Sequence, residues 1–428
     1  MILLKNATFT DWQTLDFKQT DILVEEGTDG KIILSAEDPA GFKKLQGNDT
    51  EIIDCTGKIV TKSFAVGHHH VYSALARGMD APKKNPENFY EILKYIWWTL
   101  DKALDKDMIE ASALSTAIAC AKAGSTFAID HHASPNFIEG SLDVIADAFE
   151  RVGVSHLLCY EITDRDGQEK AEQGLAETEK YLKKNQALVG LHASFTVGKT
   201  TMQKAADLMH KYNSGFHIHV AEDRYDQDRS LVNYEKRVVE RLNDYDVLSS
   251  SKTILGHCLH LSANEKNIIK NSNAWVVQNT ESNLNNNVGY FNAEGLGERL
   301  LLGTDGMHSD MLRSAQQAFF VGQGFDTIDY PGVYERFRNV HKYLAENNFS
   351  GDGDNNLVVL DYKSPAPINK DNFLGHFVFG FNASQVQHVI SDGKLIVKDG
   401  IMQTVNENEI MQFAQEQAKR LWAKMNNE

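Results

Sequence analysis

The chain has 428 residues, with 43 Lys and Arg against 59 Asp and Glu, so its formal net charge is −16 at pH 7. A surface this acidic repels phosphate backbones and anionic lipids, which argues against a protein that binds nucleic acid or membranes. With 42% hydrophobic residues and 7 prolines it can bury a large core. At about 150 residues per domain, the length allows two or three domains.

The four cysteines are scattered and form no C-x-x-C pair. This pattern predicts neither a disulfide framework nor a cysteine-rich zinc finger, and it favours a reducing compartment. The first residues, MILLKNATFTDWQ, lack the basic and long apolar segments of a signal peptide, and the sequence has no long apolar run of membrane-spanning length. We expect a soluble, cytoplasmic protein.

Both ends of the chain predict β-structure. Short alternating runs with turn residues between them fill the first 60 residues, and the same texture returns at 388–404. Asp-Gly pairs at 29–30 and 392–393 are typical of hairpin turns. We therefore predict a composite β-sandwich domain from residues 1–59 and 366–428, which also includes an amphipathic helix from about 407 onward.

The middle of the chain alternates strand and helix patterns. Eight apolar or β-branched runs are separated mostly by helical patterns, at about 58–68, 125–130, 154–162, 188–196, 215–222, 253–258, 274–279 and 299–305. This repeat predicts the α/β class and a (β/α)8 TIM-type barrel over residues 60–365. An open doubly wound sheet is the alternative, but no G-x-G-x-x-G motif supports dinucleotide binding.

Histidines follow the first predicted barrel strand, where reactive groups of such barrels lie. The strand ends in Val-Gly-His-His-His, at residues 66–70. Alternation along a strand places His68 and His70 on one face and His69 in the barrel wall. Two imidazoles two residues apart can share one metal, although histidines also occur in cores.

Three more strand ends carry groups of the same chemical kind. His219 and then Glu222 follow the fifth strand, His257 the sixth and Asp305 the eighth, whereas His217 lies deeper and is expected to fill the interior. Three imidazoles and a carboxylate suit a divalent metal such as Zn²⁺ or Fe²⁺ and leave a position for water. Such a metal brings the pKa of water to about 7, and the remaining groups can then move protons. No G-x-S-x-G elbow, P-loop or H-x-E…P-C-x-x-C signature is present.

Together, several fragments in a fixed order resemble the amidohydrolase superfamily over nearly the whole chain. More narrowly, the sequence resembles SsnA-type aminohydrolases, close to the chlorohydrolase and guanine-deaminase branches. The fragments are GHHHVYSALARGM (67–79), DHHASP (130–135), GLHASFTVG (190–198), HVAEDRYDQDRS (219–230), ESNLNNNVGY (281–290) and GLGERLLLGTDGMHSDM (295–311).

The resemblance implies a mononuclear site. By that similarity, His68 and His70 are the paired ligands of the first strand and His219 is the ligand of the fifth. Asp305 would complete the site and help to deprotonate the water. No lysine ends the fourth run, LVGLHASFT, where a bridging carbamate would be expected, and this favours one metal over two.

The same resemblance assigns three further roles. Glu222 looks like the proton shuttle of the family, and His257 is similar to the histidine that orients the hydroxide. His192 resembles a histidine that contacts substrate near the mouth of the barrel. The resemblance also implies a homo-oligomer, a dimer or larger.

Some positions depart from the family pattern. Thr61 begins a Thr-Lys-Ser segment where relatives carry Pro-Gly, a change that leaves ligation intact. Gln278 and Thr280 stand where relatives usually have histidine and proline, so the specificity is open to change at this point. His308 is interpreted as a loop histidine, with a supporting role in the site as the alternative.

We predict a metal-dependent aminohydrolase, a hydrolase of non-peptide carbon–nitrogen bonds that deaminates an amino-substituted N-heterocycle or amidine, purine- or pterin-like. The cofactor would be one divalent metal, Zn²⁺ or alternatively Fe²⁺. A chlorohydrolase, a cyclic amide or ureide hydrolase, and an inactive barrel remain alternatives. The segment 76–100 holds Arg77, Tyr95, Trp97 and Trp98. The aromatic side chains among them would stack on a flat substrate, pack beneath the loop or form a subunit contact.

Overall fold

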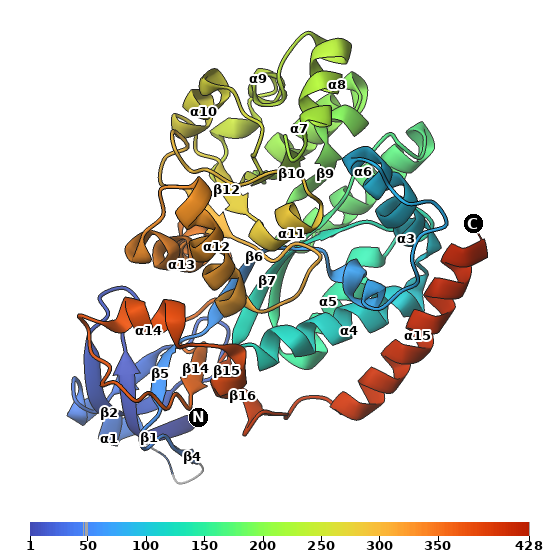
Figure 1. The fold of residues 1–428 in the computed structure, drawn as a ribbon. Coiled ribbons are helices and arrows are strands. Elements are labelled where there is room, and N and C mark those ends of the chain that lie inside the picture. Colours follow the sequence, from blue (N-terminus) through green and yellow to red (C-terminus); the bar gives the residue numbers. More distant parts are fainter. Residues whose placement is uncertain (46, 48–49, 428) are drawn as a thin grey trace.

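A barrel of parallel strands forms the centre of the protein, in a computed structural model that describes residues 1–45, 47 and 50–427 (Figure 1). Each of the eight predicted runs contains one barrel strand, and paired neighbours run parallel. The first run, 58–68, also contains β5 (Ile59–Lys62), which belongs to the terminal sheet. The strands are β6 (Phe64–His69), β7 (Ser125–His132), β8 (Ser155–Tyr160), β9 (Val189–Ala193), β10 (Phe216–Val220), β11 (Ile254–His257), β12 (Trp275–Gln278) and β13 (Leu300–Leu302). The predicted α/β barrel is confirmed.

Isolated β-bridges, rather than continuous strand pairing, close this barrel at two places. Parallel bridges join β8 to β9 at Leu158–Ala187 and Ile162–Leu191, and a bridge between His69 and Asp305 joins the first strand to the last. The bridge between His69 and Asp305 places the histidines at the end of β6 beside the loop that follows β13.

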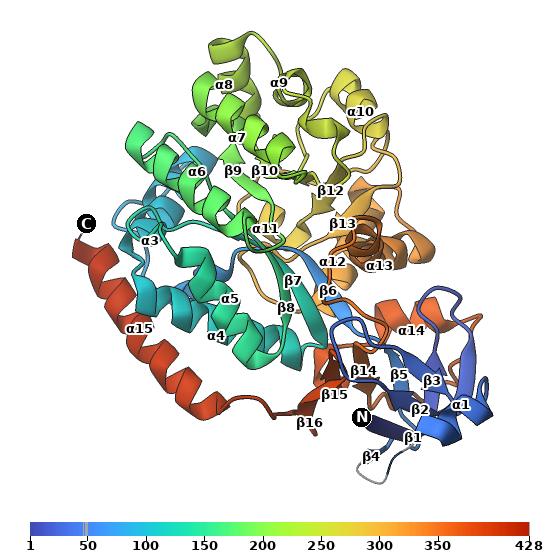
Figure 2. The same cartoon turned by 180° about the vertical axis from the view of Figure 1, so that it is seen from behind.

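Helices surround the barrel strands and cover their outer faces (Figures 1 and 2). α4 begins after Asp105, whose side chain accepts a hydrogen bond from Met108 N at 3.2 Å. It ends before Gly124, which has φ +87°. The helices are α1 (Pro39–Leu45), α2 (Phe89–Ile92), α3 (Trp98–Ala103), α4 (Lys106–Lys122), α5 (Ser141–Val152), α6 (Gln168–Leu182), α7 (Lys199–Lys211), α8 (Arg224–Tyr234), α9 (Val238–Asp244), α10 (Ala263–Lys270), α11 (Thr280–Asn285), α12 (Met311–Phe325), α13 (Tyr330–Glu346), α14 (Phe373–Phe379) and α15 (Glu407–Asn427).

The two ends of the chain meet in one sheet beside the barrel. Its order is β17-β16-β15-β14-β5-β1-β2-β3, with β4 also paired to β1, and β14 joins the two halves by pairing antiparallel with β5. The predicted hairpin at Asp392 and Gly393 links β15 and β16, with φ +49° and +73°. The strands are β1 (Ile2–Thr10), β2 (Phe17–Val24), β3 (Ile32–Leu34), β4 (Glu51–Asp54), β5 (Ile59–Lys62), β14 (Leu357–Leu360), β15 (Val386–Ser391), β16 (Lys394–Lys398) and β17 (Ile401–Met402). β14 and most of β5 lie outside the predicted ranges 1–59 and 366–428, and the domain boundaries stay a prediction.

The C-terminal helix α15 runs along the barrel beside α4 rather than over the terminal sheet (Figure 2). Trp422 donates a hydrogen bond from Nε1 to the Leu75 carbonyl at 2.8 Å. Lys424 Nζ donates to the Ala103 carbonyl at 3.2 Å. These contacts tie α15 to both ends of the segment that connects β6 to α4.

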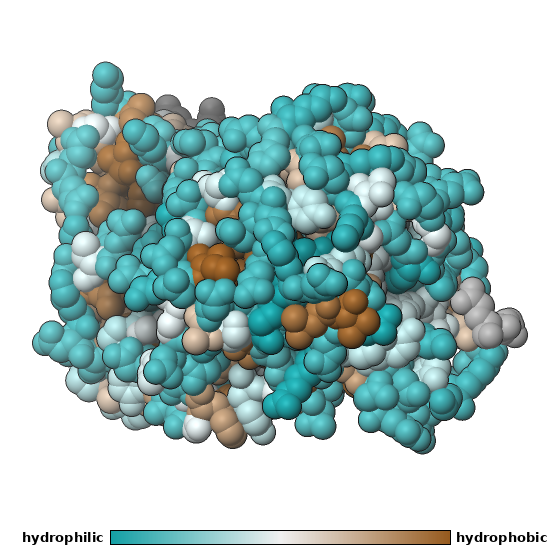
Figure 3. All heavy atoms as spheres, turned by 90° about the horizontal axis from the view of Figure 1, so that it is seen from above, coloured by the Kyte–Doolittle hydropathy of each residue, from teal (hydrophilic) through white to brown (hydrophobic). Residues whose placement is uncertain are grey.

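The face seen from above is largely hydrophilic, with separate apolar patches (Figure 3). Its polar character agrees with an ordinary content of charged residues, 24% of the chain. Among the described residues, no helix combines the length and the hydropathy that crossing a membrane requires.

The seam between β6 and β13 requires a small residue at position 67. A Cβ on Gly67 would lie 2.5 Å from the Leu302 carbonyl oxygen and 3.2 Å from Val340 Cγ2. We expect Gly67→Ala to lower the free energy of unfolding by about 1–3 kcal/mol, because overpacking pushes the strands apart. Gly375→Ala is the matched control, since nothing lies within 4 Å of its added Cβ. Urea unfolding of both variants tests this, and equal stability would contradict the tight seam.

Candidate active site

Four of the predicted side chains converge at the carboxyl end of the barrel. His70 Nε2 lies 3.0 Å from His219 Nε2 and 3.3 Å from Asp305 Oδ1. His68 Nε2 is 3.9 Å from the same carboxylate oxygen. All four residues are buried. The barrel thus brings together groups that are up to 237 residues apart along the chain, as their numbers show.

Backbone carbonyls determine which nitrogen of two imidazoles faces the centre. His70 Nδ1 donates to the His131 carbonyl at 2.7 Å, and His219 Nδ1 donates to the His192 carbonyl at 2.8 Å. A carbonyl only accepts, so the proton of each neutral ring sits on Nδ1 and the lone pair on Nε2 points inward. Burial lowers the pKa of His70 and His219, which keeps both rings neutral.

His68 is held by another histidine rather than by a carbonyl. Its Nδ1 lies 2.7 Å from His217 Nε2, and its own Nε2 is buried without a hydrogen-bond partner. His217 was expected only to fill the interior, but it orients His68. An unpartnered buried nitrogen beside two converging lone pairs and a carboxylate fits a divalent metal, because the donor set is three imidazoles and one carboxylate. His68, His70 and His219 also form a group whose ligand atoms lie within 4.8 Å of one another.

Glu222 and His257 lie next to this cluster. His257 Nε2 is 3.5 Å from Glu222 Oε2 and 3.5 Å from Asp305 Oδ2, so it stands between two carboxylates. Its Nδ1 is 2.7 Å from Asn283 Oδ1. Burial raises the pKa of Glu222 to about 7, and Asn286 Nδ2 donates to its Oε1 at 3.3 Å. These contacts place a carboxyl group that titrates near neutral pH beside the imidazole.

Three strand ends turn sharply where these groups begin. Ala221, His257 and Asp305 have φ of +47°, +65° and +53°, the left-handed region that most side chains avoid. Strained backbone of this kind is typical of functional sites, because it aims side chains that a regular strand would not. Asp305 is further held by the amide of Gly306, which donates to its Oδ1 at 2.7 Å.

A pocket opens over the cluster. One wall is aromatic, with Phe89, Trp97 and Trp98, and part of it comes from a π-helical turn, Leu93–Trp97. Among the four residues named in segment 76–100, Trp97 and Trp98 line the pocket. Arg77 and Tyr95 are not among its lining residues. A pocket with one flat apolar wall and polar groups at its base suits a planar heterocycle.

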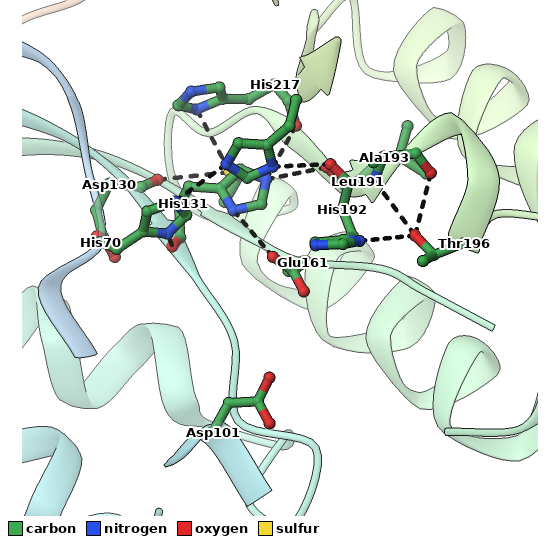
Figure 4. Close-up of polar contacts among 12 residues, drawn as sticks. His70, Asp101, Asp130, His131, Glu161, Leu191, His192, Ala193, Thr196 and His217 are labelled. Carbon is green, nitrogen blue, oxygen red and sulfur yellow. Dashed lines mark hydrogen bonds and ion pairs between the residues drawn. The ribbon is translucent and has the colours of Figure 1, made fainter. Parts of the chain in front are cut away.

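His192 lies on the pocket wall, and its predicted contact with substrate stays a prediction. Its Nδ1 is 2.8 Å from Thr196 Oγ1 (Figure 4). Its ring is 6.0 Å from that of Trp98. Because its own carbonyl accepts from His219, one residue both lines the pocket and orients a neighbour.

Gln278 and Thr280, which differ from the family pattern, do not line this pocket. Gln278 is buried, donates to Thr280 Oγ1 at 2.9 Å and accepts from Arg336 Nη1 at 2.8 Å, and it is absent from the lining residues. His308 pairs with Glu281 and contacts none of the clustered groups. The loop interpretation of His308 therefore agrees with its contacts.

Sequence reasoning missed a buried polar group on another side of the pocket. Glu161 and Arg165 follow β8 and line the pocket, and His131 Nδ1 is 3.5 Å from Glu161 Oε2 (Figure 4). Arg165 also pairs with Asp101, which precedes α4. The signal was present in YEITDRD, a run of charges directly after a barrel strand.

Comparisons with known proteins find similar sequences. The model of the amidohydrolase family matches residues 64–330. A protein named 5'-deoxyadenosine deaminase from Methanococcus vannielii is 27% identical, covering 97% of this chain and 98% of its own. A protein from Syntrophomonas wolfei named 5-methylthioadenosine/S-adenosylhomocysteine deaminase is 25% identical, covering 89% and 91%.

Two solved structures share the fold. A zinc-bound adenosine deaminase from Xanthomonas campestris superposes with TM-score 0.80 at 16% identity, covering 98% of both chains. Atrazine chlorohydrolase from Arthrobacter aurescens with zinc gives TM-score 0.81 at 13% identity, covering 98% of this chain and 100% of its own. At these identities the likeness is one of fold.

The donor cluster predicts that bound metal depends on individual ligands. We expect protein purified without chelators to carry a divalent metal, and His68→Ala to lose it, because one of four donors disappears. His308→Ala is the control, since His308 lies outside the cluster. Elemental analysis with circular dichroism of the same samples measures this. Retention of metal by a folded His68→Ala protein would contradict the assignment.

Proposed function

The chain belongs to the amidohydrolase family and is a hydrolase of carbon–nitrogen bonds, and from this premise we propose that it deaminates the adenine ring of a nucleoside-like substrate. The observation that carries the proposal is the Nε2 cluster of three histidines with Asp305 at the base of a pocket with an aromatic wall. The two relatives, a 5'-deoxyadenosine deaminase and a 5-methylthioadenosine/S-adenosylhomocysteine deaminase, support the same substrate class.

We propose one metal, zinc, held by His68, His70, His219 and Asp305. The support is the donor set, which is the one zinc prefers, and the zinc in both fold neighbours. When bound, the metal supplies a nucleophile at neutral pH by lowering the pKa of water to about 7.

The protein groups then handle orientation and protons. Asp305 accepts a proton from the attacking water, and its second oxygen faces His257 at 3.5 Å. Glu222, with a pKa of about 7, exists in both states near neutral pH and delivers its proton to a ring nitrogen. When the tetrahedral intermediate collapses, its hydroxyl group returns a proton to Glu222, and the proton held by Asp305 leaves with the amine as ammonia. His257, fixed by Asn283, stabilises the charge that develops on the tetrahedral carbon's oxygen.

Substrate orientation follows from the pocket walls. Trp97 and Trp98 offer flat apolar surface for the heterocycle, and His192 presents a ring edge beside them. The likeness to atrazine chlorohydrolase is one of fold at 13% identity, and no contact in the pocket favours chloride as the leaving group.

The test is release of ammonia from 5'-deoxyadenosine, adenosine and guanine, measured with a coupled assay. We expect the adenine nucleosides to react, and Glu222→Gln to reduce kcat by about 10²–10⁴-fold with unchanged metal content, because an amide cannot transfer the proton. Glu169→Gln, the same chemical change on an exposed residue of α6, should leave kcat unchanged. Full turnover by Glu222→Gln would show that the shuttle is another group.

Self-association remains a proposal, as does the cytoplasmic location predicted from the sequence. Self-association is supported by a group of exposed aromatic rings, in which Phe379 lies 5.8 Å from Phe320 and 5.9 Å from Tyr330. A second copy of the chain that covered them would remove apolar surface from water. Sedimentation should show a dimer or larger species that Phe379→Ser weakens, and a monomer at all concentrations would contradict this.

A further inference from the structure

The carboxyl group of Glu222 is held by few contacts. A glutamate side chain has three rotatable torsions, and the two oxygens of its carboxyl group exchange places when the last torsion turns. In the described part of the chain this carboxyl group accepts one hydrogen bond, which Asn286 Nδ2 donates to Oε1 at 3.3 Å. The orientation of the proposed proton shuttle therefore depends on the side chain of Asn286.

Asn286 is itself anchored at the end of α11. It is buried, and its backbone amide donates to the Ser282 carbonyl at 2.9 Å. Two residues later, the Val288 amide donates to the Asn283 carbonyl at 3.1 Å. The Val288 carbonyl in turn accepts from His260 Nε2 at 2.7 Å, which ties this turn to the segment that follows β11. The side chain of Asn286 therefore extends from a fixed backbone.

Neighbouring groups also determine which end of the Asn286 amide meets Glu222. Its Nδ2 lies 3.3 Å from Glu222 Oε1 and 3.4 Å from Ser282 Oγ, and both oxygens accept. Its Oδ1 accepts a hydrogen bond from Asn285 Nδ2 at 3.1 Å. The reversed amide would place Oδ1 against the carboxylate of ionised Glu222, with two acceptors and no proton between them. The group that meets the shuttle is therefore an N–H donor.

A donor at Oε1 determines which oxygen of Glu222 carries the transferable proton. In a neutral carboxyl group one oxygen carries the proton, and the other resembles a carbonyl and is the better acceptor. Because the Asn286 N–H bonds to Oε1, the proton belongs on Oε2. This second oxygen lies on the side of the donor cluster, since His257 Nε2 is 3.5 Å from it and also 3.5 Å from Asp305 Oδ2.

We propose that Asn286 is a positioning residue of the reaction: by binding Oε1 of Glu222, it keeps the transferable proton on Oε2, the oxygen that faces the reacting groups. Glu222 then gives up its proton and takes one back through the same oxygen, without turning its carboxyl group between the two steps. Asn286 exchanges no proton itself and acts only through Glu222. The inference rests on the proposed function and adds a residue to it.

The variant Asn286→Leu tests this role, because leucine keeps the branched shape at Cγ and removes the N–H. With metal-loaded enzyme and 5'-deoxyadenosine, we expect kcat for ammonia release to fall about 10- to 100-fold and KM to stay within about twofold, since a hydrogen bond to a charged group contributes a factor of this order. Metal content should not change. Asn185→Leu, the same change on an exposed residue after α6, is the control and should leave kcat unchanged.

A double-mutant cycle separates positioning of the shuttle from a structural role. When Asn286→Leu is added to Glu222→Gln, we expect a further loss of kcat of less than about twofold, because the shuttle through which Asn286 acts is already absent. A role in supporting the pocket wall would cost the same factor in both backgrounds. If circular dichroism shows that Asn286→Leu does not fold, Asn286→Asp, which keeps the shape and also lacks the N–H, takes its place in both experiments.

The outcomes distinguish this inference from the proposed function. Unchanged kcat in Asn286→Leu, or an equal loss in both backgrounds, would overturn the positioning role and leave the deaminase function intact. A rise in KM with unchanged kcat would assign Asn286 to substrate binding and also overturn the inference. Full turnover by Glu222→Gln would remove the shuttle, and no ammonia from the unmodified enzyme would overturn the proposed function. The inference would fail with either.

Discussion

Two hydrogen bonds from imidazole to backbone carbonyl organise the site. His70 and His219 each give the Nδ1 proton to the main chain of a neighbouring strand, at His131 and His192. The acceptors belong to the barrel itself, so the ring orientation is as rigid as the strands. A side-chain acceptor would allow the ring to rotate, whereas a carbonyl in a parallel sheet does not. The inward lone pairs of the site thus follow from the closure of the barrel, and the close approach of β6 and β13 at Gly67 sets their spacing from Asp305.

The strands and the donor cluster could be predicted from sequence because both leave local patterns. A buried parallel strand reads as an apolar run, and period-two alternation placed His68 and His70 on one face. Strand ends then placed Asp305 and His219 at the same rim of the barrel. Those features need only the residues within one strand and the rule that strand ends of such a barrel meet.

Other features leave no local pattern, because they depend on partners that are distant in the chain. Arg165 and Asp101 are 64 residues apart, and nothing in either segment indicates that they pair. His217 reads as interior filling until the position of His68 is known. Gln278, which differs from the family pattern, accepts a hydrogen bond from Arg336 of α13 and is absent from the pocket lining. Pairings of this kind arise from packing, so the polar wall of the pocket required the structure.

The helix α15 has a consequence for the order in which the protein matures. It binds the carbonyls of Leu75 and Ala103, and between these points lies the segment that carries Trp97 and Trp98. During synthesis the barrel strands leave the ribosome long before α15 does, so the aromatic wall lacks this support until the last helix has docked. A nascent chain would thus hold its barrel strands together before the aromatic wall of its pocket is complete.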